Sequence, residues 1–235
     1  MDTPVIELKN VWKTYQMGNN EINALRDVSL KINRGEFVAV VGPSGSGKST
    51  ALNIIGCLDL PTKGTIFLNG NDITKLSEST LANLRGKAIG FIFQQFNLIP
   101  TLTALENVTL PMMFQNINQN LRLKVGVDLL TKFGLNERLN HKPNELSGGQ
   151  SQRVAISRAL ANNPDVILAD EPTGNLDSKT GEEVMNFLTN IHEKEGKTVV
   201  LVTHDLGLVH HAERVIYLKD GSIDKITKRG VKWKD

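Results

Sequence analysis

Hydrophobic and polar positions alternate near the start of the chain, in "VIELKNVWKTY" (5–15) and again in "ALRDVSLKIN" (24–33). A period of two is typical of half-buried antiparallel strands. The segment "EFVAVV" (36–41) instead carries a continuous apolar run, which predicts a strand that is covered on both faces. A glycine-rich turn follows it, and then "KSTALNIIGCL" (48–58), apolar at helical spacing. Strand, glycine loop and helix in this order are typical of a nucleotide-binding unit.

A second buried strand, "VILAD" (166–170), begins about 120 residues after the glycine loop. A parallel crossover needs only about a dozen residues, so most of this interval is expected to be an insertion. Along it the pattern predicts a strand at 64–70, a helix at 78–87, a strand at 88–93 and a helical stretch from about 103 to 161, where "TALE" has the spacing of a capping box. After it we expect a helix over 178–194 ended by Gly196, a strand at 198–203 and a hairpin turning at Asp220 and Gly221.

Composition and charge exclude few classes of protein. Hydrophobic residues make up 40% of the 235 residues and charged residues 22%, which is ordinary for a globular domain. The net charge of +2 is too small to predict nucleic-acid binding. The single cysteine, Cys57, lies in an apolar run and is expected in the core. The start "MDTPVIELKN" does not resemble a signal peptide, and no window approaches the ~20 apolar residues of a membrane span. We therefore expect a cytosolic chain whose membrane role, if any, needs another chain.

The segment "GPSGSGKST" (42–50), here called the phosphate loop, matches the pattern GxxxxGKS in full. Its glycines allow positive φ and a close approach of the backbone, so that successive N–H groups point at phosphate oxygens. We expect Lys48 to reach the β and γ phosphates of a nucleotide and the Ser49 hydroxyl to take a Mg²⁺ position.

Acidic and histidine side chains follow two other buried strands. Asp170 ends "VILAD", where a carboxylate can hold Mg²⁺ through water, and Glu171 comes next. Adjacent acids at the tip of an apolar strand are costly for packing alone, so one is expected to serve the metal and the other to accept a proton from water. His204 follows "TVVLVT" and should emerge at the same edge of the sheet, where it could contact the γ-phosphate.

The motifs "GPSGSGKST", "LSGGQ" (146–150), "VILADEP" and "VTHD", in this order, resemble the ATP-binding subunit of an ABC transporter. The resemblance runs from Tyr15 to about residue 221, and "FNLIPTLTALENVTLPM" and "DEPTGNLDSKTGEEVM" are most similar to the ATPases of lipoprotein-release and macrolide-export systems. It implies an α/β fold with a P-loop NTPase core and a mixed parallel sheet, an N-terminal antiparallel β subdomain and an inserted α-helical subdomain. The single domain would divide into a core of about 1–94 and 163–235 and a helical part of about 95–162.

The resemblance also implies roles for individual residues, with ATP and Mg²⁺ as cofactors. Tyr15 would stack on adenine, Gln94 would link Mg²⁺ and the attacking water to the helical part, Glu171 would be the general base and His204 the γ-phosphate sensor. Asp177, in "GNLD", would contact the opposite subunit. The full set comprises, for catalysis, Glu171, His204 and Gln94; for the metal, Ser49, Gln94 and Asp170; and for ATP, Tyr15, Gly42, Pro43, Ser44, Gly45, Ser46, Gly47, Lys48, Ser49, Thr50, Ser147, Gly148, Gly149, Gln150 and Asp177.

Residues 147–150, "SGGQ", here called the signature turn, look like a second phosphate-binding turn. Ser147 and Gln150 have capping-box spacing, so Ser147 could simply cap its own helix. Two glycines in the first turn cost roughly 0.5–1 kcal/mol each, however, which favours a close approach to the backbone. The turn has no lysine and no adjacent carboxylate for magnesium, so it can only complete a site. By resemblance, two chains pack head to tail, and each signature turn closes over the phosphate loop of the other when ATP binds.

The resemblance further implies a separately encoded transmembrane permease as partner, a homodimer formed on ATP binding, no nucleic-acid partner, and a position on the inner face of the cell membrane. The apolar segment 96–114 could line a groove for a cytoplasmic helix of the permease, or be core. Alternatives are a regulatory ATPase that drives a membrane partner without transport, and an ABC ATPase acting on DNA or ribosomes. The basic tail, 226–235, is interpreted as a solvated end, with contact between Trp233 and a membrane as the alternative.

Overall fold

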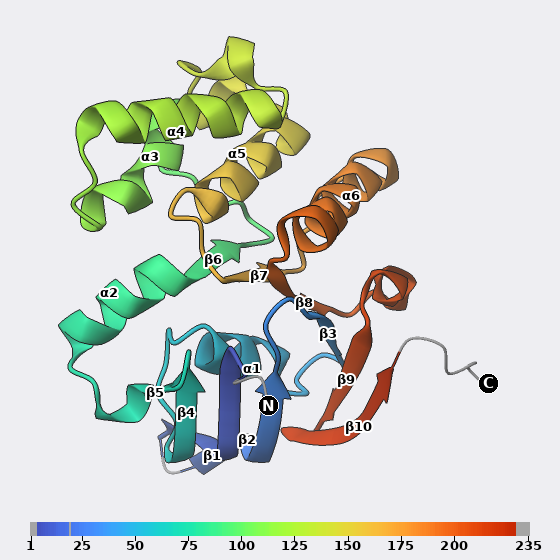
Figure 1. Cartoon of the computed structure of the whole chain (residues 1–235). Helices are drawn as coiled ribbons and strands as arrows, with labels where there is room; N and C mark the ends of the chain where they lie inside the picture. The colour runs from blue at the N-terminus through green and yellow to red at the C-terminus, as the bar shows by residue number, and fades with distance from the viewer. Residues whose placement is uncertain (1–3, 19, 229–235) are drawn as a thin grey trace.

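The computed structural model describes residues 4–18 and 20–228. Trp233, and with it most of the basic tail, lies outside the described residues, whereas residues 226–228 belong to the last strand. Two β-sheets and a group of helices form the molecule (Figure 1). This is an α/β fold with an antiparallel N-terminal sheet, as the sequence predicted.

The six-stranded sheet has the strand order β10-β9-β3-β8-β7-β6 and is mixed. The pairs from β9 to β6 are parallel and only the pair of β9 and β10 is antiparallel. Every residue of β3 and β8 is buried, because helices or the second sheet cover both faces. The strands are β3 (Phe37–Val41), β6 (Ile89–Ile92), β7 (Val166–Asp170), β8 (Thr198–Thr203), β9 (Arg214–Lys219) and β10 (Ser222–Lys228).

The register of this sheet brings three strand ends together. Val41 of β3 pairs with Thr203 of β8, and Asp170 of β7 pairs with Val202. The chain therefore leaves β3, β7 and β8 at the same edge, and the residues that follow these strands become neighbours although they are far apart in the sequence.

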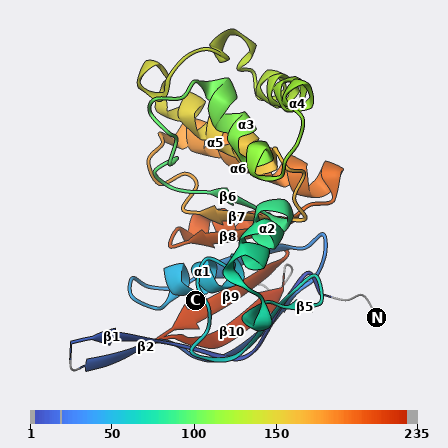
Figure 2. The ribbon, with the colours of Figure 1, turned by 90° about the vertical axis from the view of Figure 1, so that its left-hand side faces the viewer.

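The second sheet is antiparallel and has the order β2-β1-β4-β5. Figure 2 shows the hairpin of β1 and β2 projecting beyond the rest of this sheet. The alternation at 5–15 and 24–33 correctly predicted its two long strands. The bounds are β1 (Ile6–Met17), β2 (Asn20–Ile32), β4 (Lys63–Leu68) and β5 (Asn71–Asp72).

Helix α1 (Lys48–Ile55) lies between the two sheets (Figure 2), where Ile54 packs in one cluster with Ile6 of the antiparallel sheet and Val200 of the mixed sheet. Helix α6 (Ser178–Glu195) covers the opposite face of the mixed sheet (Figure 1), with Leu188 in the cluster beneath it. It ends at Gly196, whose φ of 65° is left-handed, as predicted.

A third apolar cluster belongs to the inserted helices. The predicted helical stretch over 103–161 is in fact three helices separated by turns, because Asn118 caps a new helix and residues 133–147 turn back. The capping box of Thr103 and Glu106 is confirmed. The inserted helices are α3 (Ala104–Phe114), α4 (Gln119–Lys132) and α5 (Gly148–Leu160). Helix α2 (Glu78–Ala88) precedes them, and its buried residues Leu81 and Ala88 pack in the cluster between the two sheets. Short 3-10 turns lie at Ile73–Lys75, Asn136–Arg138, Pro143–Glu145 and Leu206–His211.

The apolar segment 96–114 is divided between the core and the surface. Ala104, Val108 and Met112 are buried in the cluster of the inserted helices. Met113 and Phe114, at the end of α3, are 49% and 73% exposed. Within the part of the chain that the structure describes, no helix is long and apolar enough to cross a membrane.

Cys57 is 1% exposed, which confirms its predicted place in the core. It follows α1, and its sulfur lies among the residues that fill the space between the two sheets. Burial raises the pKa of the Cys57 thiol to about 12, against the opposing effect of the Arg85 charge. The thiol therefore stays protonated at neutral pH, and a protonated thiol is a poor nucleophile.

This burial predicts how Cys57 reacts with a disulfide reagent such as dithiobis(nitrobenzoate) at pH 8. The folded protein should release almost no thiolate dye, and one equivalent should appear only after denaturation. In the control variant Leu121→Cys, at a position that is 52% exposed, one further thiol should react at once. Immediate reaction of Cys57 in the folded protein would contradict the described packing.

Candidate active site

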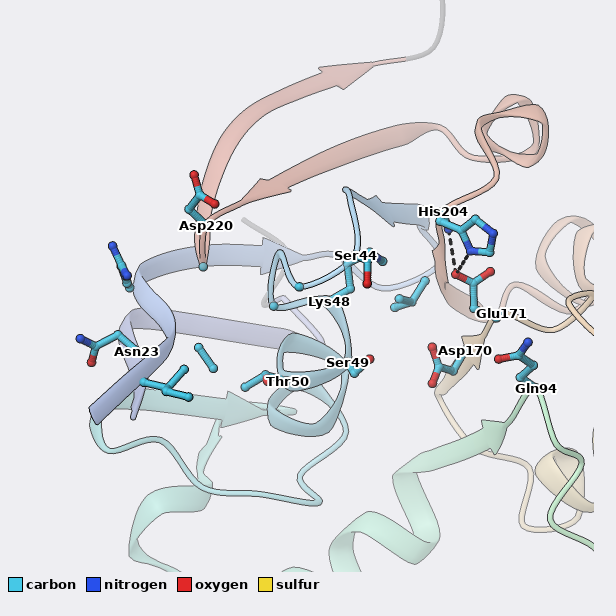
Figure 3. A pocket seen from close by; sticks show the side chains of 17 residues that line it. Asn23, Ser44, Lys48, Ser49, Thr50, Gln94, Asp170, Glu171, His204 and Asp220 are labelled. Carbon is cyan, nitrogen blue, oxygen red and sulfur yellow. Dashed lines mark hydrogen bonds and ion pairs between the residues drawn. The ribbon is translucent and has the colours of Figure 1, made fainter. Parts of the chain in front are cut away.

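A cavity of about 830 Å³ opens at the sheet edge where β3, β7 and β8 end (Figure 3). Its volume suits a ligand of nucleotide size. One end is formed by the phosphate loop and by residues after β7 and β8, and the other by β2 and the turn between β9 and β10. The lining residues are Ile22, Asn23, Ala24, Arg26, Ser44, Gly45, Gly47, Lys48, Ser49, Thr50, Gln94, Asp170, Glu171, Val202, His204, Asp220 and Gly221.

The backbone of the phosphate loop is shaped by close contacts on its outer side. Gly47 has φ of 99°, and a Cβ there would lie 2.5 Å from the carbonyl oxygen of Ala24 in β2. The turn between β9 and β10 supports the same loop, because the Gly221 N–H donates to the Ser46 carbonyl at 3.1 Å. No sequence pattern predicted that this C-terminal turn would meet the loop, because the two segments lie far apart in the chain.

Lys48 and Ser49 lie at the start of α1, whose first N–H groups have no side-chain cap. Such N–H groups can bind an anion. The Lys48 ammonium donates to the carbonyl oxygens of Gly42 and Pro43, at 2.8 and 2.9 Å, so its positive charge is held inside the loop. Gly42, Pro43 and Ser46 belong to the predicted ATP site but do not line the cavity, and Ser46 is 2% exposed.

Asp170 faces the cavity from the end of β7, close to Ser49 in Figure 3. Burial, and then the neighbouring charge of Glu171, raise the pKa of the Asp170 carboxyl, while the charge of Lys48 lowers it. The carboxylate is therefore a costly charge in the free protein. A bound cation would remove part of that cost, and the oxygens of Asp170, Ser49 and Gln94 are ligands of the kind that Mg²⁺ prefers.

Glu171 is held by three hydrogen bonds to the end of β8. Its Oε1 accepts from the backbone N–H of His204 at 2.8 Å and lies 2.6 Å from His204 Nδ1 (Figure 3), and its Oε2 accepts from the Thr203 hydroxyl at 2.9 Å. Glu171 also has φ of 44°, a left-handed conformation that turns the chain out of β7. The predicted pair of Glu171 and His204 is thus in direct contact. Thr203 was not predicted, because a threonine at the end of a strand is an ordinary strand residue.

Gln94 lines the cavity from the segment after β6. The backbone carbonyl oxygen of Gln94 accepts a hydrogen bond from the Asn175 side chain at 2.9 Å. The next residues are unusual, since Phe96 and Asn97 both have positive φ, and the Arg158 guanidinium of α5 donates to both of their carbonyl oxygens. Asn175 and Arg158 were not predicted, because their contacts join segments that lie far apart in the sequence.

Tyr15 is absent from the cavity lining, although Ile22, its partner in the β1–β2 register, is present. Its hydroxyl donates to Asp59 at 2.9 Å, and the Lys13 ammonium lies 5.0 Å from the ring centre. Burial, and then the hydrogen bond to Asp59, raise the pKa of Tyr15. The ring remains 37% exposed beside the cavity.

The signature turn and Asp177 also lie outside this cavity. The predicted capping box is present, with the Ser147 hydroxyl accepting from the Gln150 N–H and the Gln150 side chain accepting from the Ser147 N–H. A contact within the same chain explains why residue 149 is a glycine: a Cβ there would lie 2.5 Å from the Thr180 side chain of α6. The absence of a side chain at Gly149 therefore has an explanation in packing against α6. At Gly148, by contrast, a Cβ would lie no closer than 3.6 Å to any neighbouring atom, the nearest belonging to Leu176.

Comparisons with known proteins agree with this geometry. The sequence profile of the family described as "ABC transporter" matches residues 25–174, more than half of the chain. An uncharacterized ABC transporter ATP-binding protein of Methanocaldococcus jannaschii, MJ0796, is 56% identical over 95% of this chain and 97% of its own length. The macrolide export ATP-binding/permease protein MacB of Shewanella sp. (strain W3-18-1) is 49% identical over 95% of this chain, which spans 34% of that longer protein.

Solved structures give the same answer. A dimeric structure of a post-hydrolysis state of the ATP-binding cassette MJ0796, bound to ADP and Pi, has a TM-score of 0.88 and 54% identity to this chain. It covers 95% of this chain and 98% of its own. A second dimeric structure of MJ0796, described as an ABC transporter cassette, has the same TM-score and 55% identity. With its phosphate loop, its paired acids and its signature turn, the chain belongs to the ABC transporter family as an ATP-hydrolysing, ATP-binding subunit.

Proposed function

We propose that the chain hydrolyses ATP as one half of a head-to-tail homodimer that forms when ATP binds. One observation carries the proposal: the signature turn lies outside the cavity that contains the phosphate loop of its own chain. The turn offers uncommitted N–H groups at the start of α5, where the helix dipole favours an anion. A second chain could bring its own turn to that cavity. The dimeric structures of MJ0796 support this arrangement.

The phosphates would be bound by the phosphate loop, with Lys48 moving from the Gly42 and Pro43 carbonyls to phosphate oxygens. We assign the metal position to Ser49, Asp170 and Gln94, whose oxygens are ligands that Mg²⁺ prefers. A bound cation would also stabilise the charged form of Asp170, which burial and Glu171 destabilise in the free protein. Bound there, the metal would neutralise charge on the phosphates. Tyr15, which is exposed beside the cavity, would stack on the adenine ring.

Glu171 would act as the general base that accepts a proton from the attacking water. The Glu171 side chain is 17% exposed, whereas the His204 side chain is 71% exposed. His204 can therefore turn away from Glu171 and towards the γ-phosphate without disturbing packed neighbours. Gln94 reaches the same cavity from the segment that leads to α3, and so connects the reacting end of the nucleotide to the inserted helices.

Closure and reopening follow from shared binding. If the γ-phosphate is bound by the phosphate loop of one chain and the signature turn of the other, ATP stabilises the closed pair by its affinity for that state. Hydrolysis removes the group that both chains hold, so the pair opens. Asp177 caps α6 in its own chain, accepting from Thr180 at 3.1 Å, and we place it at the contact with the partner chain.

We further propose that this cycle drives a separately encoded transmembrane permease, in export, from the inner face of the cell membrane. The macrolide export ATP-binding/permease protein MacB supports such a partner, because its name combines both functions and this chain matches 34% of MacB's length. A second cavity of about 260 Å³ lies between the core and the inserted helices, and it includes Phe93, next to Gln94, and Pro111 of α3. Met113 and Phe114, exposed at the end of α3, extend the apolar surface beside this cavity. A cytoplasmic helix of the permease would bind in the groove that they form together.

The variant Glu171→Gln tests the shared site. Removing the base should lower the rate of ATP hydrolysis by about a hundredfold or more, so ATP stays bound and the closed dimer persists. Size-exclusion chromatography of this variant should give a dimer with ATP and a monomer without nucleotide. A variant that binds ATP at saturation and remains monomeric would refute the shared-site proposal.

The matched control is Ser147→Arg in the Glu171→Gln background. A bulky cation at the signature turn should abolish the ATP-dependent dimer, because the partner's phosphate would no longer fit against the helix start. Binding of ATP by the monomer, measured by calorimetry, should be nearly unchanged. A fall in that affinity equal to the loss of the dimer would mean that the turn acts within its own chain.

Asp170→Asn tests the metal assignment through pH. Since the folded protein raises the pKa of Asp170 above its ordinary 3.8, the charged form costs stability at any pH above the folded value. The variant should therefore melt at a higher temperature than the parent at pH 7 without nucleotide, and this gain should fade as the pH falls through the folded pKa. It should also bind ATP more weakly than the parent in the presence of Mg²⁺.

The exposed Asp224 provides the control for this prediction. Asp224→Asn should leave both the melting temperature and the Mg²⁺ dependence unchanged. If Asp170→Asn lowers the melting temperature at pH 7, the carboxylate is stabilising in the free protein and the charge argument is wrong.

A further inference from the structure

We infer that Thr203 is a positioning residue that holds the carboxylate of Glu171 in its working orientation. The inference rests on the proposed role of Glu171 as the general base. Thr203 is the last residue of β8 and is 0% exposed, so it does not reach the nucleotide cavity and would act only through Glu171.

The direction of the Thr203 hydrogen bonds is fixed by its neighbours. The backbone N–H of Asp205 can only donate, and it donates to the Thr203 hydroxyl oxygen at 3.0 Å. The hydroxyl proton is left for the carboxylate, and Thr203 Oγ1 lies 2.9 Å from Glu171 Oε2. The hydroxyl is thus anchored on one side by backbone and on the other points at the side chain of the base.

Glu171 needs such support because its other contacts are due to change. Its Oε1 is bound by the backbone N–H and the Nδ1 of His204. When His204 turns towards the γ-phosphate, Oε1 keeps only the backbone N–H. The second oxygen then depends on Thr203, which is the only side chain that donates to it among the described hydrogen bonds. The left-handed backbone of Glu171 directs the side chain to this place, and the hydroxyl fixes the rotation of the carboxylate there.

Packing alone does not call for a hydroxyl at this position. Valine has nearly the shape of threonine and suits a buried strand equally well. Thr203→Val therefore removes the two hydrogen bonds while it keeps the volume, and Thr203→Ser keeps the hydroxyl while it removes a methyl group.

The same strand offers a matched control in Thr198. It is also 0% exposed, and its hydroxyl oxygen also accepts a backbone N–H, that of Gly35, at 2.9 Å. It lies at the opposite end of β8 from Glu171. Thr198→Val should therefore remove the hydroxyl acceptor of a backbone N–H, as Thr203→Val does, without any effect on the base.

The test measures kcat and KM for ATP in these three variants and in Glu171→Gln, with melting temperatures for each. Thr203→Val should lower kcat about tenfold, the effect expected for one lost positioning hydrogen bond, and leave KM within about twofold. Thr203→Ser should keep kcat within about threefold of the parent, and Thr198→Val should keep it fully. If the valine variant does not fold, Thr203→Ala against Thr203→Ser gives the same comparison.

Equal kcat values for Thr203→Val and Thr198→Val would overturn the inference, as would a serine variant as slow as the valine variant. Glu171→Gln separates this result from a failure of the proposed function. If Glu171→Gln itself hydrolyses ATP at the parent rate, then Glu171 is not the base. If Glu171→Gln is inactive and Thr203→Val is fully active, only the role of Thr203 fails.

Discussion

The parallel pairing of β3, β7 and β8 is the constraint on which the whole site depends. Its register places Val41, Asp170 and Thr203 at one edge of the sheet, so that the phosphate loop, the acids and the histidine follow three adjacent strands. Complete burial of β3 and β8 makes a slip of this register costly, since every residue would lose its packed neighbours. Chemistry at this edge is therefore precise because it is built on strands rather than on free loops.

The inserted helices are tied to this edge by a few polar contacts. Arg158 of α5 is bonded to the two residues with positive φ that follow Gln95, and Gln152 of the same helix donates to the Pro172 carbonyl at 2.6 Å, next to Glu171. The helix that begins with the signature turn thus touches both the segment of Gln94 and the segment of the base. A movement of α5 towards or away from a partner chain would therefore shift both segments. In this way, opening and closing of the proposed dimer would be transmitted to the permease groove.

Sequence analysis predicted the parts of the fold and site that depend on local pattern. Continuous apolar runs gave β3, β7 and β8, and the phosphate loop, Asp170, Glu171 and His204 stand where strand ends place them. The contacts that join distant segments could not be predicted in this way. Residues of α3 are buried in the cluster of the inserted helices, and Thr180 of α6 approaches Gly149 closely. The bond from Thr203 to Glu171 and the support of the loop by Gly221 join residues whose own neighbourhoods look ordinary.

The central claim is that one site is built by two chains, and mixing two inactive variants tests it most directly. Lys48→Ala removes the phosphate lysine, and Ser147→Arg blocks the signature turn, so each homodimer lacks a complete site. In a mixed dimer, the intact phosphate loop of the second variant meets the intact signature turn of the first. Hydrolysis of ATP should therefore reappear on mixing, at no more than about a quarter of the parent rate if chains pair at random and sites act independently. Two variants that are inactive alone and stay inactive at every mixing ratio would contradict the account.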